Sequence, residues 1–305
     1  MKLFVTGGSG LLGSNLALEF QRAGHRVTAT QRRHRVHIPG VSAAVCDLTV
    51  SAELSRVLAA ARPDCIVHCA AATDVDWCEA HAEESLRINA EVPVAIARLA
   101  SRLGARMVHI STDAVFDGVA GGYVESDPPC PINQYGRGKA LAEAALLREM
   151  PDALILRTNL YGWNLQPKKS LAEWVLALLE GNCVVPGFGD VVFSPVLCNN
   201  LAGWILNLLD AGRSGIFHVA SCDRASKFEF ALQLASVFGL NQELVRESSV
   251  AESELTARRA RNTWLCAGKM AAVTGRRLPS IREGLETFRT LRESGFLQTL
   301  KAATA

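Results

Sequence analysis

The stretch Thr6-Gly7-Gly8-Ser9-Gly10-Leu11-Leu12-Gly13 decides the fold of this chain. It follows a short apolar run, Leu3–Thr6, and opens a helical pattern over Leu11–Ala23. Glycines at three-residue spacing permit a tight turn and let the backbone come close to a pyrophosphate. The N-terminus of the following helix attracts the negative charge of that pyrophosphate. The stretch therefore predicts a dinucleotide site between a strand and a helix. The residues expected to line it are Gly7, Ser9, Gly10, Leu11, Leu12 and Gly13.

Beyond this stretch, the first half of the chain alternates apolar runs with helical patterns. Further strands are predicted at Arg26–Thr30, Ala43–Cys46, Cys65–Ala70, Arg106–Ser111 and Ala153–Thr158. Helices are predicted at Val50–Ala61, Ala82–Leu103 and Tyr135–Glu149. Such alternation requires right-handed crossovers and a parallel sheet with helices on both faces. The predicted fold class is α/β, a Rossmann-type doubly wound parallel sheet.

This alternation breaks down after residue 160. The second half holds more helical patterns and a punctuated stretch over 184–195, with a strand-like run at Gly215–Ala220. We therefore predict an NAD(P)-binding domain over 1–160 and a smaller C-terminal α/β substrate lobe over 161–305. Segments near 196–222 are expected to return to the main sheet. The helices predicted here are Leu171–Leu179, Leu201–Leu209, Lys227–Phe238 and Ser280–Arg292.

Composition narrows the class of protein. The chain has 305 residues with a net charge of +2, which gives no broad basic field for nucleic acid. Its nine cysteines form no C-x-x-C pair and its seven histidines no H-x-x-x-H, so we expect reduced thiols and no metal site. No apolar stretch has the length of a membrane span. These features favour a cytoplasmic protein that binds neither nucleic acid nor membrane.

The end of the second strand bears on the choice of nucleotide. An NAD site usually carries an acid there for the ribose 2′-hydroxyl, whereas this strand is followed by Arg32 and Arg33. Two guanidiniums suit a 2′-phosphate, so we predict NADPH, with NADH left open. The alternative is a pair of solvated surface arginines. Asp47, with Leu48 beside it, is expected at the adenine edge unless it only caps the next helix.

Tyr135 and Lys139 form the second informative pair. Four positions apart on a predicted helix, they share a face with Cβ atoms about 6 Å apart. Lowering a phenol pKa from about 10 to about 7 requires roughly 4 kcal/mol. One ammonium about 4 Å away supplies roughly that much at an effective dielectric near 20. The pair therefore predicts a proton donor. Thr112, at the end of the fifth strand, is expected to donate to the substrate carbonyl, with local capping as its alternative role and Ser111 as the competing hydroxyl.

Several segments together resemble the extended short-chain dehydrogenases/reductases. They are Thr6–Gly13, Cys69–Ala72, Ser111–Gly118 (STDAVFDG), Tyr135–Lys139, Arg157–Gly162, Gly215–Ala220 and Arg258–Leu265. The STDAVFDG segment is similar to the dTDP-4-dehydrorhamnose reductase (RmlD-like) branch, whose members include a non-catalytic regulatory subunit of methionine adenosyltransferase. The resemblance implies a catalytic triad and a lobe that closes over a nucleotide-sugar. The triad residues are Thr112, Tyr135 and Lys139, and the cofactor contacts added after the fourth strand are Ala70, Ala71 and Ala72.

Two departures from the family concern the substrate. Many relatives have an aromatic residue where Ala114 stands, and the stretch Gly162–Lys169 is unlike the well-studied reductases. The candidate substrate contacts are Asp74, Trp163 and Arg261, for which helix capping, core packing and a solvated surface are the respective alternatives. Further cations that could pair with a diphosphate are Lys168, Lys169, Arg258 and Arg259, although a solvated surface position is the stronger alternative for Lys168 and Lys169.

We thus expect an NADPH-dependent reductase of a 4-keto nucleotide-sugar, with Tyr135 as proton donor. An epimerase or dehydratase on the same fold stays open, because Asp113 stands where such an acid would sit. A catalytically silent regulatory subunit is the third interpretation, which the intact Tyr135 and Lys139 disfavour. A homodimer is compatible with the sequence but not specified by it.

Overall fold

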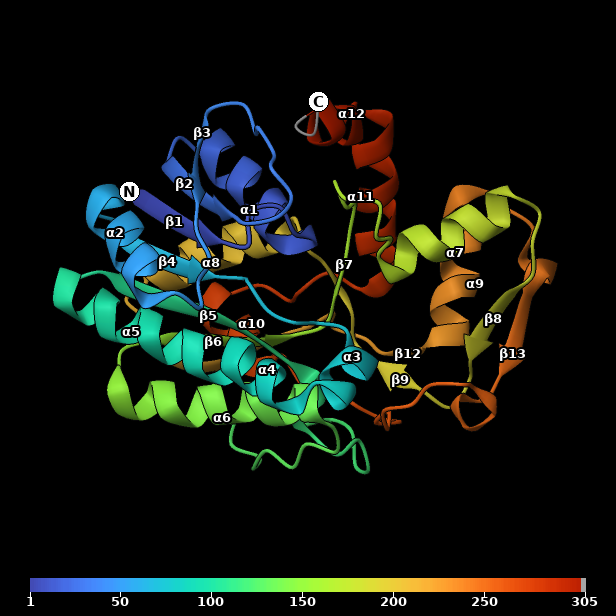
Figure 1. Cartoon of the computed structure of the whole chain (residues 1–305). Coiled ribbons are helices and arrows are strands. Elements are labelled where there is room, and N and C mark those ends of the chain that lie inside the picture. The colour runs from blue at the N-terminus through green and yellow to red at the C-terminus, as the bar shows by residue number, and fades with distance from the viewer. Residues whose placement is uncertain (303–305) are drawn as a thin grey trace.

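A seven-stranded sheet forms the centre of the molecule, in the order β11-β6-β5-β4-β1-β2-β3 (Figure 1). The computed structural model describes residues 1–302. Every neighbouring pair in this sheet is parallel, as the strand–helix alternation predicts. The strands are β1 (Lys2–Thr6), β2 (Arg26–Gln31), β3 (Val41–Val45), β4 (Cys65–His68), β5 (Arg106–Thr112), β6 (Leu154–Thr158) and β11 (Gly215–Val219). The order reverses between β1 and β4, where a ligand crevice is expected beyond the carboxyl ends of the strands.

Helices cover both faces of the sheet because its strands are apolar on both sides. Side chains alternate along β1, so that Leu3 and Val5 enter one core cluster while Phe4 enters another. The first face is covered by α1 (Leu11–Arg22), α8 (Asn200–Asp210) and α10 (Gly268–Thr274). The second is covered by α2 (Ser51–Ala61), α5 (Val92–Leu103) and α6 (Gln134–Glu149). Within residues 1–302, no helix combines the length and apolar character that a bilayer crossing needs.

The long helix predicted over Ala82–Leu103 is present, and it contains a π-helical turn. After the short helix α3 (Val75–Ala80), the chain forms α4 (Ala82–Leu86), the π turn η1 (Arg87–Glu91) and then α5 without a gap. Within the π turn, the buried Asn89 side chain accepts from the Ala72 N–H and donates to the Ala72 carbonyl, both at 3.0 Å. This long-range pairing fixes the helix locally, and helical periodicity alone does not reveal it.

Part of the second half of the chain forms a smaller lobe, seen at the right of Figure 1. There β8 (Val185–Phe188) pairs in parallel with β13 (Val245–Ser248), beside α7 (Leu171–Glu180) and α9 (Lys227–Phe238). Its core is continuous with the first face of the main sheet. The other strands and helices are β7 (Leu160–Tyr161), β9 (Val192–Phe193), β10 (Val196–Leu197), β12 (Ala225–Ser226), α11 (Ile281–Glu293) and α12 (Phe296–Ala302). Short 3₁₀ turns are η2 (Asp113–Val115), η3 (Gln242–Leu244) and η4 (Val250–Glu252).

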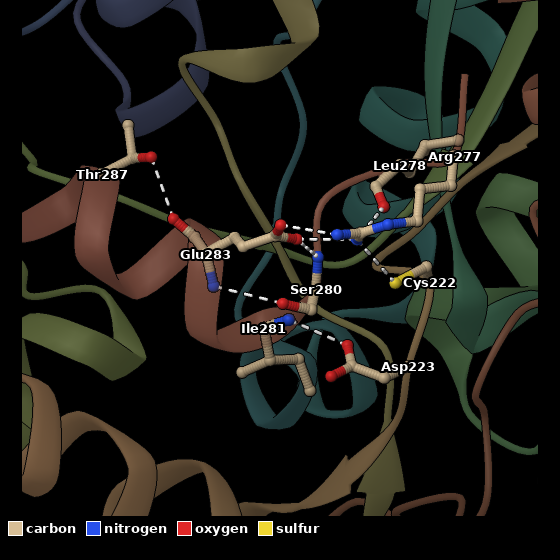
Figure 2. A network of polar contacts seen from close by, with 8 residues as sticks. All are labelled: Cys222, Asp223, Arg277, Leu278, Ser280, Ile281, Glu283 and Thr287. Atoms are coloured by element: carbon tan, nitrogen blue, oxygen red, sulfur yellow. Dashed lines mark hydrogen bonds and ion pairs between the residues drawn. The ribbon is translucent and has the colours of Figure 1, made fainter. Parts of the chain in front are cut away.

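The start of α11 is fixed by a polar network (Figure 2). Ser280 and Glu283 form a capping box, and Glu283 also receives a two-point hydrogen bond from Arg277 at 2.7 and 2.6 Å. Asp223, in the loop after β11, accepts from the Ile281 N–H at 2.8 Å. The Arg277 hydrogen bond lowers the pKa of Glu283 to about 2, so this clamp stays charged at neutral pH. It joins α11 to the end of the main sheet.

Trp163 packs in the core against this helix. Its side chain is buried, its ring stacks on Phe288 of α11 with centroids 3.9 Å apart, and its Nε1 donates to the Phe288 carbonyl at 2.9 Å. The indole therefore faces the interior, and the expectation that Trp163 contacts substrate is wrong. The physical reason is that an apolar ring with one polar N–H fits a core site that offers a carbonyl.

Replacing Trp163 with Phe tests this assignment. The variant loses one buried hydrogen bond and part of a stacked ring, so we expect the free energy of unfolding in urea to fall by about 1–2 kcal/mol. Trp174→Phe, which changes a half-exposed ring on α7, is the matched control and should change the free energy of unfolding by less than about 0.5 kcal/mol. Equal stabilities for the two variants would contradict the core assignment.

Candidate functional site

A cavity of about 740 Å³ lies at the carboxyl ends of the central strands, between the sheet and the smaller lobe. The sheet side contributes the glycine-rich turn and the ends of β4, β5 and β6, and the lobe contributes the facing wall. From the sheet side the lining includes Gly7, Ser9, Gly10, Leu11, Leu12, Gly13, Ala70, Ala71, Thr112, Tyr135 and Lys139. From the lobe it includes Phe188, Val191, Phe193, Lys227, Arg259 and Thr263.

The glycine-rich turn has the shape that a dinucleotide requires. Gly7 has φ +68°, and a Cβ on Gly13 would lie 2.2 Å from the Gly7 carbonyl oxygen, so the helix packs on the turn only without side chains. No side chain caps α1, and its first turn carries no acid. Its free N–H groups and the positive end of its dipole therefore suit a pyrophosphate.

A second hollow of about 420 Å³ is lined by Arg32, Arg33 and Asp47. The Arg32 Nη1 lies 3.0 Å from the Asp47 Oδ2, and Asp47 also accepts from the Thr49 N–H at 3.0 Å and from its hydroxyl at 2.7 Å. Asp47 thus combines the turn-capping role with a position beside the arginines. Sequence reasoning missed Arg87, which the π turn brings to the same hollow from a helix far along the chain.

Three expected ligand contacts have partners within the protein. Leu48 is partly buried and packs against the core cluster on the second face of the sheet. Ala72 uses both backbone groups on Asn89. The Asp74 carboxylate caps α3 by accepting from the Trp77 N–H at 3.0 Å, which is its alternative interpretation. Ala70 and Ala71 line the main cavity, whereas Leu48, Ala72 and Asp74 are not part of its lining.

Arg259, rather than Arg261, reaches the main cavity. Arg261 is exposed and lines an adjoining hollow with Arg258, so it is not placed for the expected substrate contact. Arg259 pairs with Asp76 at 2.8 Å, and the same carboxylate accepts from the Ala257 N–H at 2.8 Å. The Ala257 N–H and the Arg259 guanidinium hold the pKa of Asp76 below its usual value. They tie the lobe segment to α3, at the rim of the sheet.

The unfamiliar stretch Gly162–Lys169 also has a definite place. Gln166 lines the main cavity, and its side-chain amide donates to the Ser9 carbonyl in the glycine-rich turn. Lys168 and Lys169 are exposed, as their solvated alternative predicts. This stretch therefore closes the cavity over the turn through an amide, without a cation.

Tyr135, Lys139 and Glu143 lie along one stripe of α6, four residues apart. Asn133 caps the helix by accepting from the Gly136 N–H at 2.9 Å. Lys139 is buried, and its Nζ lies 2.5 Å from the Ile110 carbonyl oxygen. The stripe thus places a partly exposed phenol at the cavity and two buried charges beneath it.

The electrostatics of Tyr135 run opposite to the sequence expectation. Burial raises the pKa of Tyr135 to about 12, and the group that acts to lower it is the Thr112 hydroxyl. Burial lowers the pKa of Lys139 to about 8, against the opposing charge of Glu143. The Lys139 ammonium binds acceptors on the sheet, so it does not act on the phenol as predicted. A phenol of this pKa is fully protonated at neutral pH.

Asp113 links the sheet to the smaller lobe. Its carboxylate accepts from Thr112 at 3.1 Å, from Asn159 at 2.9 Å and from Thr263 of the lobe at 2.7 Å. Burial raises the pKa of Asp113, and these three bonds oppose that rise. Both oxygens of Asp113 are therefore used by structural donors, one on Oδ1 and two on Oδ2.

The competing hydroxyl, Ser111, is bound to a buried ion pair. It donates to Glu143, whose carboxylate lies 2.7 Å from the Arg157 guanidinium. Arg157 in turn stacks on the ring of Phe116, 4.9 Å from its centroid. Although Ser111 also lines the cavity, Thr112 is the hydroxyl that contacts Tyr135.

Lys227 is a functional candidate that sequence reasoning missed. It begins α9 and lines the cavity wall opposite Asp113, with its Nζ 5.0 Å from the centroid of the Phe193 ring. Burial lowers the pKa of Lys227, while Asp113 opposes that shift. Among residues 1–302, no carboxylate lies within ion-pair distance of it. It lies 115 residues after Thr112 and 88 after Lys139 in the sequence, so only the fold reveals it.

The described part of the chain contains no cluster of three or more His, Cys, Asp or Glu side chains placed to hold a metal ion.

Comparison with known proteins agrees with this geometry. The RmlD substrate binding domain family matches residues 1–292. The "probable low-salt glycan biosynthesis reductase Agl14" of Haloferax volcanii is 34% identical over 93% of this chain and 96% of its own. A dTDP-4-dehydrorhamnose reductase of Mycobacterium tuberculosis is 32% identical over 82% of this chain and 80% of its own. The structure of a dTDP-4-dehydrorhamnose reductase from Bacillus anthracis in complex with NADP superposes with a TM-score of 0.85 at 28% identity, covering 95% of this chain and 99% of the other.

Proposed function

Because this chain belongs to the RmlD substrate-binding-domain family of nucleotide-sugar reductases, we propose that it reduces a 4-keto nucleotide-sugar with NADPH. A dTDP-4-dehydro-6-deoxyhexose is the proposed substrate type. The observation that carries the proposal is one cavity lined by the glycine-rich turn, by Tyr135 with Thr112, and by a cation of the smaller lobe. It offers a dinucleotide site, a proton donor and an anion site around one space.

The proposed cofactor contacts fit NADPH. The turn and the uncapped start of α1 would hold the pyrophosphate, and Arg32, Arg33 and Arg87 surround the hollow where a 2′-phosphate would lie. The Bacillus anthracis relative is described in complex with NADP, which supports the same choice. When bound, NADPH supplies a hydride to a ketone carbon. NADH stays an alternative with fewer charged contacts.

Tyr135 is the proposed proton donor to the oxygen of the reduced ketone. A donor must be protonated before it acts, and the raised pKa of Tyr135 keeps its proton in place at neutral pH. Thr112 lies beside the phenol, and its hydroxyl, which donates to Asp113 in this structure, would turn its proton to the same substrate oxygen. Lys139 would hold the cofactor ribose with the N–H that its sheet contacts leave free.

The lobe wall fits the diphosphate of a nucleotide-sugar. Lys227 faces the cavity without a carboxylate partner, so an anionic oxygen there would gain a charge-assisted hydrogen bond. Arg259 adds positive charge nearby, already paired with Asp76. We therefore propose Lys227 as the main protein contact to the diphosphate.

The two rival functions have less support. A dehydratase would need Asp113 as an acid, and its carboxylate is engaged by three donors. A silent regulatory subunit would have no need for the partly exposed Tyr135 at the cavity. Lack of NADPH oxidation across dTDP-, UDP- and GDP-4-keto-sugars would favour that second rival.

Tyr135→Phe tests the proton donor. We expect kcat for NADPH oxidation with the keto-sugar to fall by about 10²–10⁴-fold, because general acid catalysis is lost, while the Kd for NADPH changes little. Tyr161→Phe is the matched control, since it removes a buried hydroxyl that has no partner among the described residues. Near-normal turnover in Tyr135→Phe would refute the mechanism.

Arg33→Ala tests the choice of cofactor. Loss of a charge-assisted contact to the 2′-phosphate should lower kcat/KM for NADPH by about 10–100-fold and leave the value for NADH nearly unchanged. The exposed Arg35, changed to Ala, is the control. A parallel fall with both cofactors, or clear preference of the unchanged protein for NADH, would count against this site.

Lys227→Met tests the diphosphate contact. The KM for the keto-sugar should rise by about 10–100-fold, with a smaller change in kcat and none in the KM for NADPH. Inhibition by dTDP should weaken in parallel, whereas any inhibition by thymidine, which lacks the diphosphate, should not. Lys168→Met, on an exposed lysine, is the control. An unchanged inhibition constant for dTDP would remove Lys227 from the proposal.

A further inference from the structure

Two buried histidines lie beneath Lys139. His68 on β4 and His109 on β5 are direct register partners in the parallel sheet. Their rings stack with centroids 5.4 Å apart at an interplanar angle of 24°, and both side chains are shielded from solvent. Such a pair inside an apolar sheet face has a cost in desolvation, so its contacts need an explanation.

The hydrogen bonds of Lys139 explain the position of His109. An ammonium has three N–H groups. One points to the Ile110 carbonyl oxygen at 2.5 Å and one to the His109 Nε2 at 3.1 Å. Both acceptors belong to β5, on the floor of the site. One N–H is left, and Lys139 lines the cavity, so this N–H is available on the cavity side.

The protonation of both rings follows from their partners. Burial and the neighbouring Lys139 hold the pKa of His109 well below its usual value, so the ring is neutral and its Nε2 accepts. The Thr6 Oγ1 already accepts from the N–H groups of Cys69 and Ala70, so its own proton points to the His68 Nδ1 at 2.7 Å. The remaining nitrogens, His68 Nε2 and His109 Nδ1, have no partner among residues 1–302.

We propose that His109 is a positioning residue for the reduction: its Nε2 binds one N–H of Lys139, keeps that amine charged, and directs the remaining N–H to the bound cofactor. His68, held by Thr6, fixes the plane of the His109 ring. This inference rests on the proposed function, because it gives Lys139 a cofactor to hold. The ionisable groups that face Lys139 are Glu143 and Cys69, which favour its charged form, and the two neutral histidines.

The pH dependence of His109→Leu tests the proposal. Loss of the acceptor removes a bond to the charged form, so Lys139 releases its proton at lower pH. The alkaline limb of kcat/KM, which the proposed function assigns to loss of the Lys139 charge that holds the cofactor, should move down by about one pH unit. His109→Gln, whose amide oxygen can accept in place of Nε2, should return the alkaline limb of kcat/KM to its position in the unchanged protein. If the leucine variant does not fold, His109→Asn, with an amide one methylene shorter, should give the same shift.

His218→Leu is the matched control for a purely structural effect. His218 is also buried in the sheet, on β11, where it contacts Arg157 and the Tyr123 carbonyl rather than Lys139. Its replacement should lower stability and leave the alkaline limb in place. A limb that moves equally in the His109 and His218 variants would overturn the positioning role.

NADPH binding gives a readout that needs no keto-sugar. The Kd for NADPH, measured by fluorescence from pH 6 to 10, should rise above the Lys139 pKa of about 8 in the unchanged protein and from lower pH in His109→Leu. Failure of the unchanged protein to bind NADPH would contradict the proposed function. Normal binding, with the same dependence of Kd on pH in the unchanged protein and in His109→Leu, would contradict only the role of His109.

Discussion

The site depends on the packing of a polar stripe of α6 against an otherwise apolar sheet. Lys139 and Glu143 are 3% and 2% exposed, so each charge must find partners inside the protein. Lys139 binds β5 through the Ile110 carbonyl and His109, while Glu143 binds Arg157 on β6. Since these bonds fix the rotation of α6 about its axis, they also fix where Tyr135 meets the cavity, one turn earlier on the same stripe.

The cavity lies between the sheet and the smaller lobe because the chain leaves the sheet after β6, forms the lobe, and returns to the sheet as β11. β11 pairs with β6 after the excursion through α7 and β8, and the lobe segment around Thr263 and Arg259 is fixed to Asp113 and Asp76. Carboxylates that could have served as acids are used instead to hold two parts of the chain together. A cation, Lys227, is left on the lobe wall as the charge available to a ligand.

Sequence reasoning succeeded where local geometry dominates and failed where distant contacts do. The seven strands of the main sheet were predicted to within a few residues, because buried parallel strands form continuous apolar runs between turn signals. The helix over 82–103 was predicted correctly, but its π turn was not, because periodicity carries no record of the Asn89 side chain bonding to Ala72. Trp163 and the pKa of Tyr135 were misjudged for the same reason: burial and partners depend on residues far along the chain.

The strand–turn–helix around Gly7 and Gly13 and the shared face of Tyr135 and Lys139 follow from local sequence, since steric freedom and helical repeat act over a few residues. The groups that surround those residues depend on how the whole chain folds. The tertiary structure placed His109 beneath Lys139, engaged Asp113 on three sides and brought Lys227 to the cavity. Desolvation and hydrogen bonding depend on neighbours in space, and a folded sheet and lobe supply those neighbours from anywhere in the chain.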